Sequence, residues 1–233
     1  MTPPHVEAVR SRGLDRGWTR RRDIRISLSD ADGRDQAVGR ASLHLVADTL
    51  TDILRAEVDT LGQVACIIAP NSLHHLFLVE WKSTYPGAKV YAPPGLRTKR
   101  KDIAFDADLG NASSPDWAGE IDQVLMQGNL ITTEVVFFHV GSGTVLFTDL
   151  IQQFPVSLFS SWRGLVAKLD LMTGPEPSVP RKFRIAFTNR RAARDSLQRI
   201  FAWPAERVLM AHGTPVEKDA QAFLRRAFRW LAA

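Results

Sequence analysis

The sequence contains almost no cysteine and no long apolar run. Its 233 residues include one cysteine, Cys66, which lies in the apolar run Val64–Ile68 and is expected to be an inert core residue. A single cysteine excludes an internal disulfide and a cysteine-based zinc site. No stretch approaches the roughly 18 apolar residues of a spanning helix, and the N-terminus lacks the basic flank and apolar core of a secretory signal. We therefore expect a cytoplasmic protein.

The net positive charge is small outside the first 40 residues. The formal net charge of the chain is +5, and residues 1–40 hold nine arginines against six acidic residues. This segment is poor in apolar residues and shows no sustained helix or strand period, so we predict a weakly structured, Arg-rich N-terminal arm over residues 1–40. Clustered arginine can bind phosphates, but the run Arg20–Arg22 has no interleaved aromatic residues, and we do not expect nucleic acid as a partner.

Residues 41–233 are expected to form one domain in which strands and helices alternate, because no repeat or low-complexity linker interrupts them. The last helix has the clearest predicted start, since Thr214, Pro215 and Glu217 supply an N-cap, a first-turn proline and a capping-box glutamate. Short apolar or β-branched runs predict strands, and apolar residues at helical spacing predict helices. The predicted strands are 64–68, 89–92, 121–126, 134–140, 144–147, 183–187 and 208–211, and the predicted helices are 50–61, 71–85, 162–169, 191–201 and 214–231.

Polar side chains follow three of the predicted strands at the point where each strand ends. Asn71 is expected to cap the helix that carries His74 and His75. Asp149 follows the second strand of a predicted hairpin, and His212 follows the last strand. Catalytic and binding side chains of α/β proteins gather at such strand ends, so these residues are the candidate functional residues.

The order of these features resembles the metallo-β-lactamase superfamily, and most closely a degenerate branch of unknown function. The resemblance covers about residues 50–233 and implies an αββα sandwich, in which two mixed β-sheets lie between helices. The likeness is carried by Asn-x-x-His-His-Leu-Phe at 71–77, Pro-Gly-Ala-Lys-Val-Tyr-Ala at 86–92, Leu-Phe-Thr-Asp at 146–149 and Ala-His-Gly at 211–213.

Active members of that superfamily hold two metal ions, and the resemblance implies that this chain has lost the first site. Their motif Thr-His-x-His-x-Asp-His aligns its last two positions with His74 and His75. The two earlier histidine positions then fall on Pro70 and Ser72, and the Gly-His of the family becomes Thr133-Glu134. A shifted register of the motif leads to the same conclusion.

The second metal site of the family is better preserved. Its ligands in relatives correspond to His74, His75, Asp149 and His212, so the resemblance implies one Zn²⁺ or Fe²⁺ ion bound there. The opposing interpretation is that adjacent histidines point about 100° apart on a helix and need not reach one ion. In that case Asp149 anchors the segment after the hairpin, and His212 braces the turn at Gly213.

Other polar residues could hold an anionic ligand near these positions. Asn71, Glu134 and Arg97 are the candidates for ligand binding. Arg97 belongs to a basic loop that also contains Lys99–Lys101, and a solvated loop without a ligand is the alternative for these charges.

Two functions remain open from the sequence. The first, which we favour, is a non-catalytic protein that binds a small anionic molecule or a partner protein. The alternative is a mononuclear metal-dependent hydrolase of an ester, thioester or lactone, in which a metal-activated water attacks the substrate. We expect no membrane partner.

Overall fold

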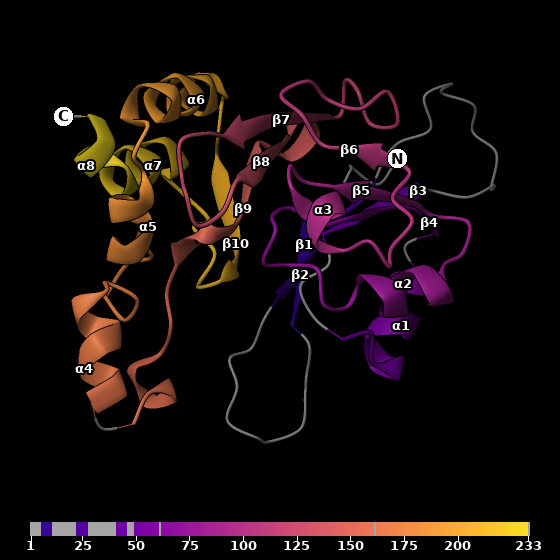
Figure 1. Cartoon of the computed structure of the whole chain (residues 1–233), viewed down its shortest axis with the longest axis horizontal. Helices are drawn as coiled ribbons and strands as arrows, with labels where there is room; N and C mark the ends of the chain where they lie inside the picture. Colours follow the sequence, from indigo (N-terminus) through magenta and orange to yellow (C-terminus); the bar gives the residue numbers. More distant parts are fainter. Residues whose placement is uncertain are drawn as a thin grey trace.

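The computed structural model describes residues 6–10, 22–27, 41–45, 49–60, 62–160 and 162–232. Two β-sheets face each other, and helices cover the outer side of each sheet (Figure 1). This architecture confirms the predicted αββα sandwich of two mixed β-sheets. Within the described ranges, no helix is long and apolar enough to cross a lipid bilayer.

The first sheet has six strands and mixes both strand orientations. β1 is antiparallel to β2, β2 is antiparallel to β3, and β3 to β6 run parallel to one another. Parallel neighbours need crossover connections, which helices α1, α2 and α3 supply in turn. The strands, in spatial order, are β1 (Val6–Arg10), β2 (Arg22–Ser27), β3 (Ala41–Leu45), β4 (Gln63–Ile68), β5 (Lys89–Ala92) and β6 (Ala107–Asp108), and the helices are α1 (Asp52–Asp59), α2 (Leu78–Thr84) and α3 (Leu96–Lys99).

The second sheet has four strands in the order β10-β9-β8-β7. It consists of β7 (Ile121–Met126), β8 (Glu134–His139), β9 (Thr144–Gln152) and β10 (Arg207–His212), and η1 (Val140–Ser142) joins β8 to β9. β9 is antiparallel to β8 and parallel to β10. The register between β10 and β9 shifts, because Met210 lies opposite Phe147 whereas His212 lies opposite Gln152. β9 therefore bulges between these two positions.

Helices from the C-terminal part of the chain cover the outer side of the second sheet (Figure 1). Most of them pack their apolar faces on β7 to β10, whereas α4 extends away from the sheets. These elements are η2 (Val156–Leu158), α4 (Trp162–Leu169), α5 (Arg181–Ala186), α6 (Arg190–Ala202), α7 (Ala220–Ala227) and α8 (Arg229–Ala232).

Three hydrophobic clusters occupy the three interfaces between the layers. The cluster between the two sheets contains Cys66, which is 2% exposed, as expected for a core residue. One outer cluster joins the first sheet to α1 and α2 around Trp81, and the other joins the second sheet to the C-terminal helices around Phe147. The sandwich is thus held by apolar burial on both faces of both sheets.

The prediction that residues 1–40 form a weakly structured arm is wrong for two stretches. β1 and β2 lie within that segment, and β2 pairs with β3. In β2, Ile24 and Ile26 alternate with Arg25 and Ser27, but this strand period is too short to stand out in a segment so poor in apolar residues. β1 has no sustained alternation and is defined by its pairing with β2. The rest of residues 1–40 lies outside the described residues.

Two further predictions of secondary structure are wrong. Residues 183–187, expected as a strand, contain most of α5, in which Phe183 is buried and Ile185 is 79% exposed. A short apolar run does not distinguish a buried strand from a helix. The last helix was expected to begin at Thr214 but begins at Ala220, because Val216 exchanges two 2.9 Å backbone hydrogen bonds with Val208 and stays extended.

Candidate metal centre

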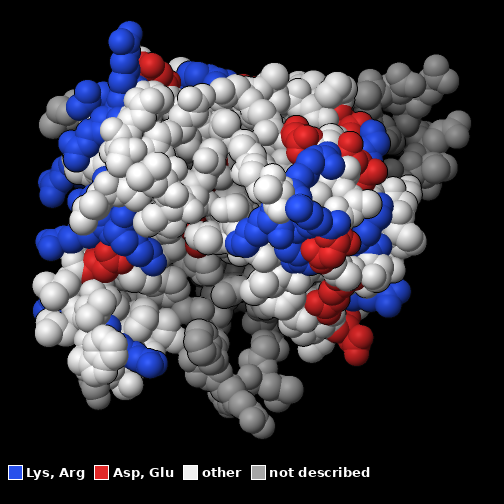
Figure 2. Space-filling model, viewed as in Figure 1, with Lys and Arg blue, Asp and Glu red and all other residues white. Residues whose placement is uncertain are grey.

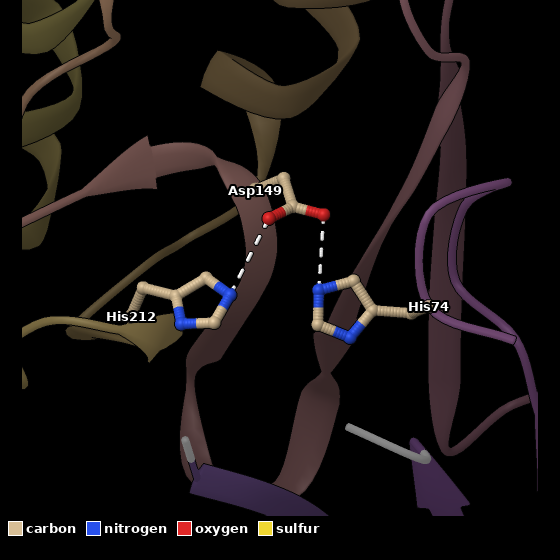
Figure 3. Close-up of side chains that lie close together, drawn as sticks. All are labelled: His74, Asp149 and His212. Atoms are coloured by element: carbon tan, nitrogen blue, oxygen red, sulfur yellow. Dashed lines mark ion pairs between the residues drawn. The ribbon is translucent and has the colours of Figure 1, made fainter. Parts of the chain in front are cut away.

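Three titratable side chains from distant parts of the chain meet at one edge of the sandwich. His74 lies in the β4–α2 loop, Asp149 in β9 and His212 at the end of β10. His74 Nε2 is 2.9 Å from Asp149 Oδ2, and His212 Nε2 is 3.4 Å from Asp149 Oδ1. Figure 3 shows the two imidazoles directed at different oxygens of the one carboxylate. One ligand atom from each residue lies within 4.8 Å of those of the other two.

The β4–α2 loop, rather than a helix, presents His74. The prediction that Asn71 caps a helix containing both histidines is wrong, because α2 begins only at Leu78. Asn71 Oδ1 instead accepts hydrogen bonds from the backbone N–H groups of Leu73 (2.8 Å) and His74 (3.0 Å). This local turn, typical of asparagine, sets the direction of the loop and brings the His74 side chain towards β9.

The side-chain amide of Asn71 also ties this loop to the second sheet. Its Nδ2 donates to Thr148 Oγ1 and Asp149 Oδ2, both at 2.9 Å, and to Glu134 Oε2 at 3.3 Å. Asn71 is completely buried. A buried amide with these contacts fixes the position of Asp149 relative to His74.

Glu134 holds the bulge of β9 in place. Its carboxylate accepts the backbone N–H groups of Thr148 and Asp149 at 2.8 Å and of Leu150 at 3.1 Å. Burial and the nearby charge of Asp149 raise the pKa of Glu134, against the lowering effect of these amide hydrogen bonds. Three consecutive amides on one carboxylate turn the side chain of Asp149 towards the two histidines.

The Asp149 carboxylate is the centre of the cluster. Besides the two histidines, Asn71 Nδ2 donates to Oδ2, and Gln152 Nε2 donates to Oδ1 at 3.1 Å. Burial would raise the pKa of Asp149, but the charges and hydrogen bonds of His74 and His212 outweigh burial and hold it well below its usual range. Asp149 is therefore an anion in a nearly buried site, where it is 6% exposed.

Aromatic rings enclose the cluster on the side of His212. The rings of His74 and His212 lie 5.6 Å apart between centroids, and Phe154 lies 5.4 Å from His212. Phe154 in turn contacts Phe159, at 6.0 Å. An apolar wall beside two imidazoles limits the access of water and strengthens electrostatic interactions within the site.

The donor set fits one metal ion. Two imidazole nitrogens and one carboxylate oxygen are ligands that Zn²⁺ accepts, and the same set with open positions suits Fe²⁺. Within the described ranges, these three residues are the one group of this kind. Pro70 and Glu134 stand at two positions that the resemblance aligns with ligands of the first metal site. The carboxylate of Glu134 accepts backbone amides, and the carbonyl of Pro70 accepts the N–H of Val135 at 2.8 Å.

The structure does not bring all predicted site residues together. His75 turns away from the cluster, with its Nδ1 2.9 Å from Arg100 Nη1, and burial together with Lys99 and Arg100 lowers its pKa. Arg97 pairs with Asp108 at 2.6 Å and donates to the carbonyl of Phe105. Asn71 and Glu134 do belong to the site, where they contact Asp149 and its backbone rather than an open surface.

Gln152 and Phe154 are site residues that sequence reasoning missed. Gln152 is the last residue of β9, and Phe154 lies two positions after it, whereas the predicted strand ended at residue 147. The apolar run Leu150–Ile151 could have extended that prediction to Gln152. The contact between Phe154 and His212 depends on the pairing of β9 with β10, which carries no local signal.

Comparison with known proteins supports the same architecture. The sequence matches no protein-family model and no curated protein. Its structure is similar to that of DIM-1 metallo-beta-lactamase, with a TM-score of 0.60, 13% identity, and coverage of 100% of this chain and 94% of that one. It is also similar to a metallo-beta-lactamase from Pontibacter korlensis, with a TM-score of 0.57, 11% identity, and coverage of 100% and 96%.

A protein of another type shares the fold. The metal-soaked Flv1 flavodiiron core from Synechocystis matches with a TM-score of 0.59 and 13% identity over 99% of this chain and 61% of that one. The chain therefore has the metallo-β-lactamase fold, and the resemblance seen in the sequence is confirmed at that level. Identities this low establish the fold and leave the activity to be argued from the site.

Proposed function

We propose that this protein holds a single divalent metal ion, Zn²⁺ or Fe²⁺, between His74, Asp149 and His212, and that it has lost the first metal site of its fold. The observation that carries this proposal is the convergence of three metal-ligating side chains from three separate elements within 4.8 Å. The network of Asn71 and Glu134 takes the place of the first site and positions Asp149.

Such a centre is suited to hydrolysis. With an ion held by His74, Asp149 and His212, a coordination position would remain for water, and the ion would supply the positive charge that lowers the pKa of that water and polarises an ester, thioester or lactone carbonyl. His74 and His212 would use their Nε2 lone pairs, so each would give up its hydrogen bond to Asp149. Asn71 and Gln152 keep the carboxylate oriented, and Phe154 restricts water beside His212.

Titration calorimetry tests the site directly. After treatment with a chelator, the wild-type chain should bind Zn²⁺ in a one-to-one complex, and His74→Ala or His212→Ala should abolish this binding. His75→Ala is the matched control, because His75 is the neighbour of His74 in sequence but faces Arg100. Equal loss of binding in His75→Ala and His74→Ala would contradict the assignment of ligands.

A second candidate function is a non-catalytic binding protein, and one observation favours it. The Asp149 carboxylate already lies within hydrogen-bond reach of four donors, on His74, His212, Asn71 and Gln152. A carboxylate with four donors is satisfied without a metal ion. The fold would then support recognition of a small anionic molecule or a partner protein, with the cluster as a structural element.

Turnover separates the two candidates. The metal-loaded wild-type chain should hydrolyse at least one member of a panel of esters, thioesters and lactones, and His212→Ala should not. Thermal unfolding with and without chelator supplies an independent readout, because an ion that binds only the folded state raises the unfolding temperature. A chain with no hydrolysis and an unchanged unfolding temperature is the binding protein of the second candidate.

A further inference from the structure

Helix α4 turns its small residues inward and its large apolar residues outward. Ala167 is 3% exposed, and a Cβ placed on Gly164 would lie 3.4 Å from the carbonyl oxygen of Phe159. The outward stripe is Trp162, Leu165, Val166 and Leu169, with exposed fractions of 68%, 60%, 52% and 55%.

These four residues follow the spacing i, i+3, i+4, i+7, which places them on one face of a helix. In a helix of a globular protein this face normally packs on the core. In Figure 1, α4 projects beyond both sheets. The short η2 segment before it exposes a further apolar side chain, Val156, at 67%. A contiguous apolar face of this kind on a folded protein marks an interaction surface.

The positive charge of the chain is concentrated in the C-terminal segment to which α4 belongs. Residues 156–233 hold fourteen Lys and Arg against six Asp and Glu, a net charge of +8, whereas residues 1–155 carry a net charge of −3. Figure 2 shows Lys and Arg side chains gathered over the C-terminal helices and a mostly uncharged surface over α4. The helical layer therefore combines an apolar face with strong positive charge.

Cations border the apolar stripe along α4 and at its C-terminal end. The guanidinium of Arg163 lies 5.8 Å from the Trp162 ring, and Lys168 is exposed in the last turn of α4. At the C-terminal end of α4, Asp170 accepts the backbone N–H groups of Arg181 and Lys182, which places the first turn of α5 directly against this end of the helix. Both of these α5 side chains are exposed.

We infer that α4 docks this protein onto an anionic lipid surface, with the Trp162–Leu169 stripe entering the headgroup region and the surrounding cations contacting lipid phosphates. Tryptophan and leucine on one helix face and lysine and arginine beside it are the composition of interfacial helices. A second copy of the chain would bring two positively charged layers together, and nucleic acid would leave the apolar stripe uncovered. The expectation of no membrane partner rested on the absence of a spanning run, which a peripheral surface does not require.

Vesicle co-sedimentation with the full chain tests this inference. The protein should sediment with vesicles of phosphatidylcholine and phosphatidylglycerol in equal parts, and should stay in solution with vesicles of phosphatidylcholine alone. Binding should weaken as salt is raised. The double variant Leu165→Gln/Leu169→Gln and the charge variant Arg163→Glu/Lys168→Glu should each reduce the partition coefficient at least about tenfold.

Ile53→Gln is the matched control, since Ile53 is an apolar side chain on α1 with a similar exposure of 61%, and it should bind vesicles as the wild type does. Circular dichroism melting checks that each variant is folded. The two double variants alter different side chains, so if one of them does not fold, the other still tests the inference. Absence of binding to phosphatidylglycerol vesicles, or undiminished binding by a folded double variant, overturns the inference. Self-association that the Leu165→Gln/Leu169→Gln variant removes also overturns it, because the occupant is then a second copy.

Discussion

The Glu134 carboxylate accepts the backbone N–H of Asp149 at 2.8 Å, so one buried carboxylate positions the backbone that presents another. The two acids differ in their partners. Glu134 is bonded by neutral amides and its pKa is raised, first by burial, whereas Asp149 faces two imidazoles that hold its pKa low despite burial. This division lets two acidic side chains share a small buried volume while only Asp149 faces the candidate metal ligands.

Removal of the Glu134 side chain should destabilise the protein strongly. Glu134→Ala leaves the buried N–H groups of Thr148, Asp149 and Leu150 without their acceptor, and we expect a loss of about 3 kcal/mol or more in the free energy of unfolding. Glu134→Gln keeps one acceptor oxygen and should lose less. Urea unfolding measures both, and Glu57→Ala on the exposed face of α1 should change stability by less than about 0.5 kcal/mol. Equal stability of Glu134→Ala and Glu57→Ala would show that Glu134 does not hold the bulge.

A third carboxylate in the cluster should not be tolerated. Asn71→Asp replaces the amide donor that contacts Glu134 and Asp149 with an acceptor, and places like charges together in a buried site. We expect a loss of roughly 3 kcal/mol, measured by chemical denaturation near neutral pH. Asn111→Asp is the matched control, because Asn111 is exposed and contacts the cation of Arg199. Its stability should stay close to that of the wild type, and a similar loss in both variants would contradict the role given to Asn71.

Two glycines should respond oppositely to alanine. Gly128 has a φ of 87°, and a Cβ there would lie 2.3 Å from the carbonyl oxygen of Asn189, at the start of α6. Gly128→Ala should therefore lose about 1–3 kcal/mol from backbone strain, with a further loss from the clash. Gly87→Ala meets nothing within 4 Å and should be neutral or slightly stabilising. Differential scanning calorimetry of the two variants checks this contrast, which fails if the unfolding temperatures shift together.

The Cys66 thiol should be unreactive in the folded protein. Burial, with a smaller contribution from Asp116, raises the pKa of Cys66 to about 12. Iodoacetamide should alkylate the native chain far more slowly than the urea-unfolded chain. Because the folded thiol keeps its proton to a higher pH than the unfolded thiol, stability should fall as pH rises above about 9. Rapid alkylation under native conditions would contradict the burial of this residue.

The sequence predicted the parts of the fold that depend on local pattern. Strands β4, β5, β7, β8 and β10 and helix α6 lie close to their predicted ranges, because their apolar runs and stops are encoded within each segment. β9 begins where predicted but continues to Gln152. The helix predicted over 71–85 forms only from Leu78, and the predicted cap at Thr214 is wrong, because contacts with distant residues determine the backbone at both places. Asn71 bonds to β9 instead of capping a helix, and Val216 pairs with Val208.

The contrast between local sequence pattern and contacts with distant residues also explains which parts of the site could be predicted. His74, Asp149 and His212 were identified because each follows or ends a recognisable strand. His75 is absent from the cluster of ligands because of the conformation of the β4–α2 loop and its contact with Arg100, which lies 25 positions further along the chain. The contribution of Glu134 depends on the pairing of β8 with β9 and on the bulge of β9, neither of which is encoded locally.

The most direct test of the single-metal account is the metal content of the chain purified without an affinity tag. Inductively coupled plasma mass spectrometry should find about one equivalent of zinc or iron per chain in the wild type and in His75→Ala, and almost none in His74→Ala. Less than about a tenth of an equivalent in the wild type, with no uptake when Zn²⁺ or Fe²⁺ is supplied, would contradict it.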